Sequence, residues 1–563
     1  MGRPLGLALL ALVPACFLAV FFVWPVATLV ARGFAGPGGL DLGVFAEVMG
    51  KARTWRLIGR TVGQAAVATA LCVLAGLPVA ALAWRRDFRG RGLLRGLLTA
   101  PFALPSVVVG LAFKALLGES GPLGFVGLDQ TFGGVVLALV FFNVGLMARV
   151  VGTFWAGLDP RPEQAARVLG ASPLRAFATV TLPALAPAVA AAGALVFLFC
   201  ATAFAPVLIL GGAAYATVET EIYLQTAQML NLRAAAVLSI VQLAVVAGAL
   251  WLGAVARRPR RQAGPGQAGA ARAAGPARAA RLGWRRDWPL VAASGIVVAL
   301  IVLPLGNLVY LSLRWDGGVG IGHFAALADP GLAGQPYSLL AAAGRSVAVA
   351  LLAGAIALAL GLAVAVVASR PARAGWARWA QGAFDSAVMA PLGVSAVTVG
   401  FGFLITLNRA PLNLRTSFWL IPLAQALVAL PLVVRLVLPS LQAVSPRARQ
   451  AAAVLGAPPW RVFATVEGPL LRRGAAVAGA YAFAVSVGEF GATAFLVRPD
   501  TTTLPVAIYR LLSRPGGDNL GLAMAAAVVL ALITAAAMAV AEAARAAGRR
   551  PGGGAAGGAA WGL

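Results

Sequence analysis

EQAARVLGASPLRAFATVTLP, residues 163–183, recurs 286 positions later as RQAAAVLGAPPWRVFATVEGP, residues 449–469. Fourteen of the 21 positions are identical. Both copies are short polar segments in a chain whose residues are 60% hydrophobic. We therefore expect each copy to be a surface by which a partner in the water holds a membrane protein.

The composition of the whole chain predicts its fold class. Only 11% of the 563 residues are charged, which leaves too little polar surface for a soluble protein of this length. Apolar windows of about 20 residues, the length that spans a bilayer, recur along the whole chain. We predict an all-α polytopic membrane protein with about twelve transmembrane helices, at roughly residues 5–30, 61–84, 93–117, 132–154, 184–211, 233–255, 288–313, 345–369, 383–407, 417–439, 473–497 and 520–543.

The same offset extends beyond the repeated segment and divides the chain into two homologous six-helix halves. It aligns, without a gap, Arg149 with Arg435, Phe204 with Phe490, and Tyr223 with Tyr509. Because each half has six spans, both have the same orientation, and we expect them to surround a central pathway. The predicted organisation is a first transmembrane half at 1–255 with a core permease domain at about 57–253, a basic linker rich in Pro, Gly and Ala at 256–287, a second half at 288–546 with a core at about 341–542, and a flexible tail at 547–563.

The net charge of +27 comes from arginines in the loops between spans. Arginine-rich segments follow the second, sixth, eighth and last spans, and all lie on one side if both termini are cytoplasmic, as the positive-inside rule requires. The loop between the first two spans, which carries Lys51, Arg53 and Arg60 on the predicted outer side, is an exception. This distribution indicates membrane topology and argues against a nucleic-acid partner.

Each repeated segment contains the signals of a helix followed by a turn. Asp159 and Ser445 are expected N-caps, each followed by a proline at the first helical position. Gly170 and Gly456 suit a left-handed turn at the helix end, and Pro183 and Pro469 are expected to end a second short segment just before the next span. An amphipathic helix lying on lipid is the alternative to a docking helix.

The pattern EAA, then Gly after three residues, then Leu-Pro resembles the signature loop of the permeases of ATP-binding-cassette importers. The first copy carries it as Glu163-Gln164-Ala165-Ala166, Gly170 and Leu182-Pro183. The resemblance implies the type I permease fold of this family, coupling helices that seat on two copies of an ATPase subunit, and an external substrate-binding protein. The implied ATPase-coupling residues are Glu163, Gln164, Ala165, Ala166, Gly170 and Pro183 in the first copy and Gln450, Ala451, Ala452, Gly456 and Pro469 in the second.

The second copy departs from this pattern in two places. Arg449 replaces the acidic residue, and Glu467-Gly468 precede Pro469 in place of an apolar pair. An arginine in the first turn of a helix is mildly unfavourable, by some tenths of a kcal/mol, because the helix dipole is positive there. We therefore expect the two coupling helices to differ in strength.

ATP hydrolysis is expected in partner subunits and not in this chain. The chain has only two lysines, Lys51 and Lys114, and neither completes the phosphate-binding pattern GxxxxGK[ST]. We predict no enzyme activity, no bound cofactor and no metal site.

The resemblance covers nearly the whole chain and is strongest to fused, double-length permeases of the ferric-iron and thiamine group. Supporting stretches are FCATAFAPVLILGG at 199–212, SVGEFGATAFL at 486–496 and TLPVAIY at 503–509. It implies a multi-pass protein of the cell membrane that imports ferric iron or thiamine. A twelve-helix secondary transporter with two parallel repeats is the alternative function, and its loop pattern is matched weakly by AWRRDFRGRG at 83–92.

The predicted substrate pathway involves Glu489, Phe490, Thr202 and Phe204. Glu489 is predicted inside the eleventh span, and its counterpart in the first half is Ala203. A charge near mid-membrane faces protein or water, so Glu489 either lines the path of a cationic cargo or is hydrogen-bonded to neighbouring helix ends. Other polar residues have simpler expectations: interhelical hydrogen bonds for Asn143 and Gln242, a snorkelling side chain for Lys114, and a solvated outer loop for Glu219 and Glu221.

Overall fold

The computed structural model describes residues 2–36, 39–212, 214–257, 280–330, 336–370, 375–409, 412–514 and 517–546. Most of the predicted linker, 258–279, and the predicted tail, 547–563, lie outside the described residues. The described chain is almost entirely helical, as predicted.

The helices of the first half are α1 (Gly2–Leu18), α2 (Trp24–Gly33), α3 (Gly43–Gly50), α4 (Ala52–Arg85), α5 (Arg91–Ala103), α6 (Ser106–Leu117), α7 (Phe132–Ala156), α8 (Arg161–Val168), α9 (Pro173–Ala176), α10 (Leu182–Ala201), α11 (Ala205–Gly211), α12 (Val218–Ala227) and α13 (Leu232–Arg257). Short π-helical turns, η1 (Ala19–Val23) and η3 (Phe177–Thr181), join α1 to α2 and α9 to α10, and η2 (Gly124–Val126) is a 3₁₀ turn.

The helices of the second half are α15 (Trp284–Ser312), α16 (Gly322–Ala326), α17 (Leu339–Ala368), α18 (Gly375–Met389), α19 (Ala396–Thr406), α20 (Leu420–Gln442), α21 (Pro446–Val454), α22 (Pro459–Val462), α23 (Gly468–Val487), α24 (Thr493–Leu496), α25 (Leu504–Leu512) and α26 (Gly517–Ala546). The π-helical turn η7 (Phe463–Glu467) joins α22 to α23, and η6 (Ala390–Gly393) and η8 (Pro499–Thr501) are 3₁₀ turns.

The strands in the described residues are two residues long and form four small pairs. Antiparallel pairs join β1 (Ala35–Gly36) to β2 (Gly39–Leu40), β5 (Arg314–Trp315) to β6 (Gly318–Val319), and β7 (Asn408–Arg409) to β8 (Leu412–Asn413). The parallel pair of β3 (Arg86–Asp87) and β4 (Ala280–Arg281) ties the end of α4 to the chain just before α15.

Hydroxyl side chains begin several of the membrane helices. The side chains of Thr131, Ser338 and Ser395 accept hydrogen bonds from the backbone N–H groups of Gly134, Ala341 and Thr398, at 3.3, 3.1 and 3.1 Å. Each bond satisfies a helix N–H that has no partner within the helix, which matters where water is scarce.

Ten described helices are long and apolar enough to cross a membrane, and two bent helix pairs raise the number of spans to as many as twelve. The bent pairs, each with an angle of 101°, occupy the predicted third and ninth spans. In the third, Pro105 forces Leu104 into an extended conformation, with φ −75° and ψ 142°, so the helix stops and restarts.

The predicted fifth and eleventh spans also end earlier than expected. The fifth stops at Ala201 and the eleventh at Val487, and short helices α11 and α24 follow each break. Glu489 therefore lies beyond the end of a span and not within it, because the chain leaves the helix at Gly488.

The two halves are built from equivalent helix contacts. In the first half α4, α7 and α10 pack on one another, and in the second α17, α20 and α23 do the same. Glycines allow the closest of these approaches: a Cβ on Gly76 would lie 2.8 Å from the Met147 side chain, and one on Gly361 would lie 2.5 Å from that of Val433. Small residues favour helix association in a membrane because dispersion contacts, and not water exclusion, hold the helices together.

The first helix of each half packs on the opposite half. Helices α1 and α2 contact α17 and α19 of the second half, whereas α15 contacts α4 and α6 of the first. A bidentate ion pair between Arg86 and Asp287, with distances of 2.8 and 2.9 Å, joins α15 to the end of α4. The two halves are thus interlocked by a reciprocal exchange of helices.

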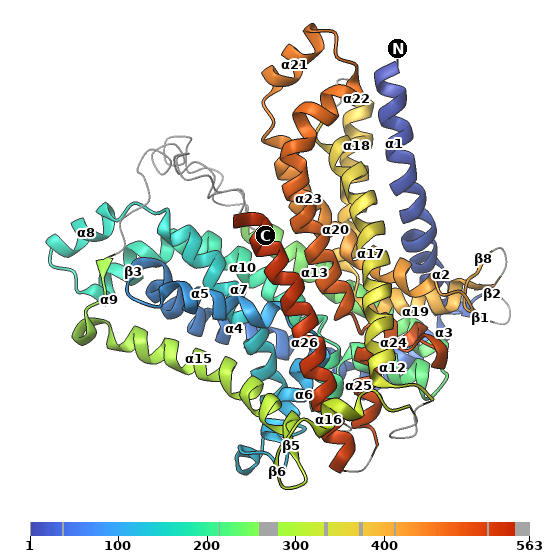
Figure 1. Ribbon diagram of the computed structural model, residues 1–563, viewed down its shortest axis with the longest axis horizontal. Coiled ribbons are helices and arrows are strands. Elements are labelled where there is room, and N and C mark those ends of the chain that lie inside the picture. Colours follow the sequence, from blue (N-terminus) through green and yellow to red (C-terminus); the bar gives the residue numbers. More distant parts are fainter. Residues whose placement is uncertain are drawn as a thin grey trace.

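The two groups of helices meet at one end and diverge towards the other (Figure 1). Helices α12, α24 and α25 lie where the groups meet, which we call the closed end. Helices α8 and α21 lie at the tips of the two diverging arms, which we call the open end. The chain therefore places its two copies of the repeated segment far out on separate arms.

We expect Gly145→Ala to destabilise the protein by about 2 kcal/mol, because a Cβ there would overlap the backbone carbonyl oxygen of Leu98 on α5. Gly344→Ala is the matched control, since a Cβ at Gly344 on α17 meets nothing within 4 Å. Thermal unfolding of the purified protein in detergent measures both variants. Equal melting temperatures for the two would contradict the close packing of α7 on α5.

Candidate functional site

The two repeated segments adopt the same helix and turn. Gly170 has φ +90° and Gly456 has φ +79°, so both predicted left-handed turns are confirmed. The turns are closed by matching hydrogen bonds, 3.1 Å from Gly170 N to Arg167 O and 3.1 Å from Gly456 N to Ala453 O. A side chain at either glycine would be strained by the backbone alone, since nothing lies within 4 Å of its Cβ position.

The start of each helix is close to the prediction. Ser445 is the N-cap of α21, although its hydroxyl makes no capping bond. Helix α8 begins one residue later than expected, at Arg161, and the Asp159 carboxylate accepts the Arg161 N–H at 3.0 Å.

Pro183 and Pro469 do not end a separate segment, contrary to the prediction. Each lies in the first turn of a span, α10 or α23, which continues from the preceding π-helical turn. A proline is tolerated at this position because the π-helical turn before it already interrupts the regular hydrogen-bond pattern of the α-helix. The part of each repeated segment that follows the glycine turn is therefore continuous with a membrane helix, Pro173–Ala201 in the first half and Trp460–Val487 in the second.

Exposed apolar side chains project from both segments. Val168 and Leu169 are 88% and 87% exposed, and their counterparts Val454 and Leu455 are both 86% exposed. Gln164, Ala165, Gln450 and Ala451 are also exposed. Large apolar side chains at a turn surrounded by charged residues are typical of a protein interface.

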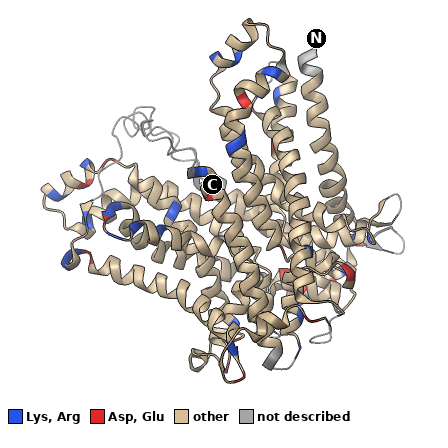
Figure 2. Cartoon of the chain, in the orientation of Figure 1, with Lys and Arg blue, Asp and Glu red and all other residues tan. Residues whose placement is uncertain are grey.

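Lys and Arg residues gather around these tips, as Figure 2 shows. The amphipathic-lipid alternative explains such a composition less well, because the exposed apolar residues lie in the turn and not along one face of a long helix.

A contact within each segment ties the helix to the base of its span. In the first half, the Thr181 hydroxyl donates to the Glu163 carboxylate at 2.8 Å. At the same two positions of the second half, Arg449 forms an ion pair with Glu467 at 2.8 Å. The arginine that departs from the family pattern thus has a partner in this chain.

Aromatic rings from both halves meet at the closed end. Phe204 and Phe490, which are equivalent in the repeat, stack with a centroid distance of 5.5 Å and an interplanar angle of 17°. Each also contacts a tyrosine of its own half, Tyr223 at 5.5 Å and Tyr509 at 5.4 Å. The stack therefore joins equivalent positions of the two halves, Phe204 and Phe490, across the interface between them. Thr202, nearby in sequence, donates its hydroxyl to Leu198 O of its own helix at 2.9 Å.

Glu489 is buried and caps a short helix. Its carboxylate accepts the N–H groups of Ala492 and Thr493 at 2.8 and 3.0 Å, and also the Thr493 hydroxyl. Both oxygens are therefore occupied by the start of α24. This geometry favours the structural alternative for Glu489 over contact with cargo.

Glu219 and Glu221 are buried, so the prediction of a solvated outer loop is wrong. Helix α12 folds back against the helices of the closed end, which encloses both side chains. Glu219 accepts the hydroxyl of Ser395 at 2.9 Å and so joins the two halves, and Glu221 pairs with Arg53 at 2.8 Å. The charge pattern alone did not reveal this, because α12 is too short and polar to be predicted as a membrane element.

Other predictions for polar residues had mixed outcomes. Lys114 does not snorkel but pairs with Asp129 at 2.7 Å. Gln242 of α13 donates to Ala201 O of α10 at 3.1 Å, and Asn143 of α7 lies 3.5 Å from Cys200 Sγ of α10, so both make the expected interhelical contacts.

Several cations of the basic loop that violates the charge rule have partners in the folded protein. Lys51 pairs with Glu47 and Arg53 with Glu221. Arg60 donates to Ala214 O at 3.3 Å and lies 5.0 Å from the Tyr215 ring centroid. In the second half, Arg345 makes the same contact with Asp500 O, at 3.1 Å. Each of these cations thus has a structural partner in the folded protein.

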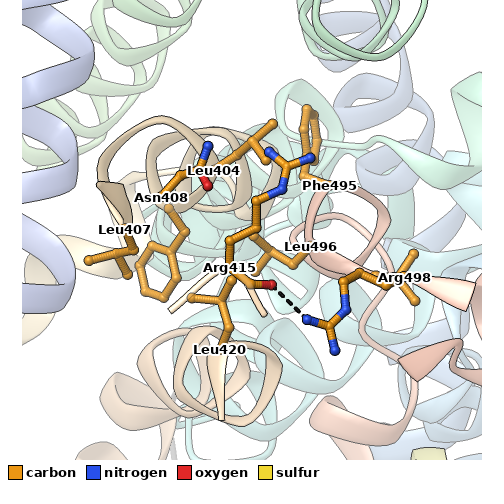
Figure 3. Close-up of a pocket in the computed structure, with 10 residues that line it drawn as sticks. Leu404, Leu407, Asn408, Arg415, Leu420, Phe495, Leu496 and Arg498 are labelled. Carbon is orange, nitrogen blue, oxygen red and sulfur yellow. Dashed lines mark hydrogen bonds between the residues drawn. The ribbon is translucent and has the colours of Figure 1, made fainter. Parts of the chain in front are cut away.

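A pocket with a volume of about 40 Å³ lies between α19, α20 and the chain after α24 (Figure 3). Arg498 donates to Arg415 O at 3.0 Å across the pocket. The same guanidinium also donates to the Asp500 carboxylate, and this second contact holds the pKa of Asp500 below its usual value. The volume is enough for a water molecule or two but not for an organic cargo. We therefore do not assign cargo binding to this pocket.

We expect Glu489→Gln to lower the free energy of unfolding by about 1–3 kcal/mol, because an amide donor would then face the N–H groups at the start of α24. Glu542→Gln is the control, since that side chain is 70% exposed. Thermal unfolding in detergent measures both variants. An unchanged melting temperature with an altered KM for cargo would instead support a pathway role for Glu489.

Comparison with known proteins identifies a transport family. Residues 72–261 match the binding-protein-dependent transport system inner membrane component family. The chain is 28% identical over 514 residues to the thiamine transport system permease protein ThiP of Brucella abortus (strain 2308), covering 88% of each chain. It is 26% identical over 468 residues to ThiP of Escherichia coli (strain K12), covering 81% of this chain and 83% of that one.

A shorter match is to the molybdenum transport system permease protein ModB of Escherichia coli (strain K12), 37% identical over 149 residues, which are 24% of this chain and 65% of ModB. The family implies ATPase and binding-protein partners and a place in the inner membrane. With ten to twelve candidate membrane segments in its described residues, arranged in two equivalent halves, this chain resembles the permease components of binding-protein-dependent importers at double length.

Proposed function

We propose that this permease forms the translocation pathway of a thiamine importer. The observation that carries the cargo assignment is the similarity to ThiP permeases along 88% of both chains. None of the relatives described above supports ferric iron, the other cargo that the sequence suggested.

The proposed partners are two ATPase subunits, one on each of α8 and α21, and a binding protein at the closed end. The exposed apolar turns at Val168–Leu169 and Val454–Leu455 support the first part, because they are equivalent surfaces at two separate tips. In this orientation the open end and both termini face the cytoplasm. The arginines near the tips agree with the positive-inside rule (Figure 2).

We further propose that cargo passes between the two halves, near Thr202, Phe204, Glu489 and Phe490. In the arrangement described here, the stack of Phe204 on Phe490 closes the pathway on the outer side. Motion of α8 and α21 reaches α10 and α23 through the glycine turns and the short helices α9 and α22, which are continuous with the spans. Separation of the two rings would then open the outer side. Glu489 contributes to this path by fixing α24 and not by binding cargo.

Uptake of radiolabelled thiamine tests the cargo. Cells that lack their own thiamine permease should accumulate thiamine when this chain is expressed with its ATPase and binding protein. Uptake should require all three components. Accumulation of ferric iron without thiamine would contradict the assignment.

We expect Gly170→Asp and Gly456→Asp each to reduce coupled transport by about tenfold or more, because an L-residue at φ +90° or +79° distorts the turn that presents the apolar tip. ATP hydrolysis and uptake, measured together in proteoliposomes, report coupling. Gly127→Asp is the control. Gly127 also has a positive φ, at +67°, but it lies in a loop away from both tips. Normal coupling in the Gly170 and Gly456 variants would contradict the docking role.

A further inference from the structure

The two coupling helices are attached to their spans by the same pair of positions with different chemistry. Positions 163 and 181 of the first half correspond to 449 and 467 of the second. The first pair is Glu163 on the helix and Thr181 at the base of the span, whereas the second is Arg449 on the helix and Glu467 at the base. The carboxylate has therefore moved from one side of the contact to the other.

An arginine from the end of a neighbouring span accompanies the carboxylate in both halves. Arg370, just beyond α17, lies 3.5 Å from Glu467, whereas Arg85, the last residue of α4, acts on Glu163 only through the longer-range attraction of their charges. Arg85 and Arg370 occupy corresponding ends of the equivalent helices α4 and α17. In each half an arginine at the end of a neighbouring span thus attracts the carboxylate of the pair.

The burial of Glu467 shows that this contact is internal. Its side chain is 2% exposed, and those of its partners Arg449 and Arg370 are 25% and 34% exposed. Arg449 is fixed further by a hydrogen bond of 2.9 Å to Leu441 O at the end of α20. A buried carboxylate is tolerated when it is paired, and removing its partner leaves an uncompensated charge. Glu467 is consequently not accessible to an ATPase subunit.

We propose that these side chains are positioning residues, which fix the orientation of each coupling helix relative to the base of its span. We call each contact, Glu163–Thr181 and Arg449–Glu467, a seat, and we propose that the two seats are interchangeable. The acid of the repeated segment then acts through the orientation of the helix and not through contact with the ATPase. This inference rests on the proposed docking of ATPase subunits at α8 and α21.

Exchange of the pairs between the halves tests the seats. Glu163→Arg with Thr181→Glu builds the second-half seat in the first half, with Arg85 in place to complete it. Arg449→Glu with Glu467→Thr builds the first-half seat in the second. Each single substitution breaks a seat: Glu163→Arg places two arginines together without the acid, and Arg449→Glu places two carboxylates together.

Two measurements on the full-length protein compare the single and double variants with wild type. The first is the amount of ATPase subunit retained per permease after purification from membranes. The second is protection of residues 161–176 and 446–462 from protease in the purified permease alone. We expect each single variant to lose about tenfold or more of the retained ATPase and to lose protection of its own segment, and each double variant to recover both to within about threefold.

Arg447→Glu is the matched control, because it makes the same change of charge on α21 at an exposed position. Its loss of ATPase must be smaller than that of Arg449→Glu, and its segment must stay protected. Equal losses in both measurements would overturn the proposal.

Other outcomes also decide the question. A double variant that recovers protection but not ATPase retention would show that Glu163 or Arg449 contacts the ATPase directly, and would overturn the proposal. A double variant that recovers neither, while its melting temperature matches wild type, would overturn it too. If wild type itself retains no ATPase, the proposed docking fails, and the protease measurement still tests the seats.

Discussion

The stack of Phe204 on Phe490 is the contact around which the two halves are arranged. In a bilayer, lipid is as apolar as the helices, so the halves gain little by merely hiding apolar surface from it. Shape must hold them together, through the stacked rings at the closed end, while glycines bring helix backbones close within each half. Among the described residues, the polar contacts between the halves include the buried Glu219–Ser395 hydrogen bond and the Arg86–Asp287 ion pair. An interface of this kind can separate and close again without leaving many unpaired polar groups.

The sequence predicted the fold class, the two halves and the turns at Gly170 and Gly456, because span hydropathy and helix-end signals are local properties. It did not reveal the breaks at Leu104, Ala201 and Val487, since hydropathy stays high through each break. It also missed the burial of Glu219 and Glu221, which depends on helices distant in the sequence. The exchange of α1 and α15 between the halves is a matter of tertiary packing, on which the repeat gives no information.

The contact between Arg449 and Glu467 could have been predicted from the sequence. Arg449 and Glu467 both differ from their counterparts, and the two differences have opposite charge. Read separately, the arginine indicated a weaker second coupling helix through an unfavourable interaction with the helix dipole. In the structure Arg449 pairs with Glu467, so the interaction with the helix dipole is not its only interaction, and the relative strength of the two coupling helices stays a prediction. Comparing paired differences between copies is therefore more informative than comparing single positions.

The reciprocal packing of α1 and α15 has a consequence for the order of synthesis. Helix α15 finds its partners α4 and α6 already made, whereas α1 must wait for α17 and α18. At about 5–20 residues per second, that delay is roughly 20–80 s. The first span thus packs on α13 of its own half through α2, while its α1 part lacks its main partner until α17 has been made. Because one polypeptide supplies both halves, its eventual partner is always tethered to it, and the encounter does not depend on the concentration of a second subunit.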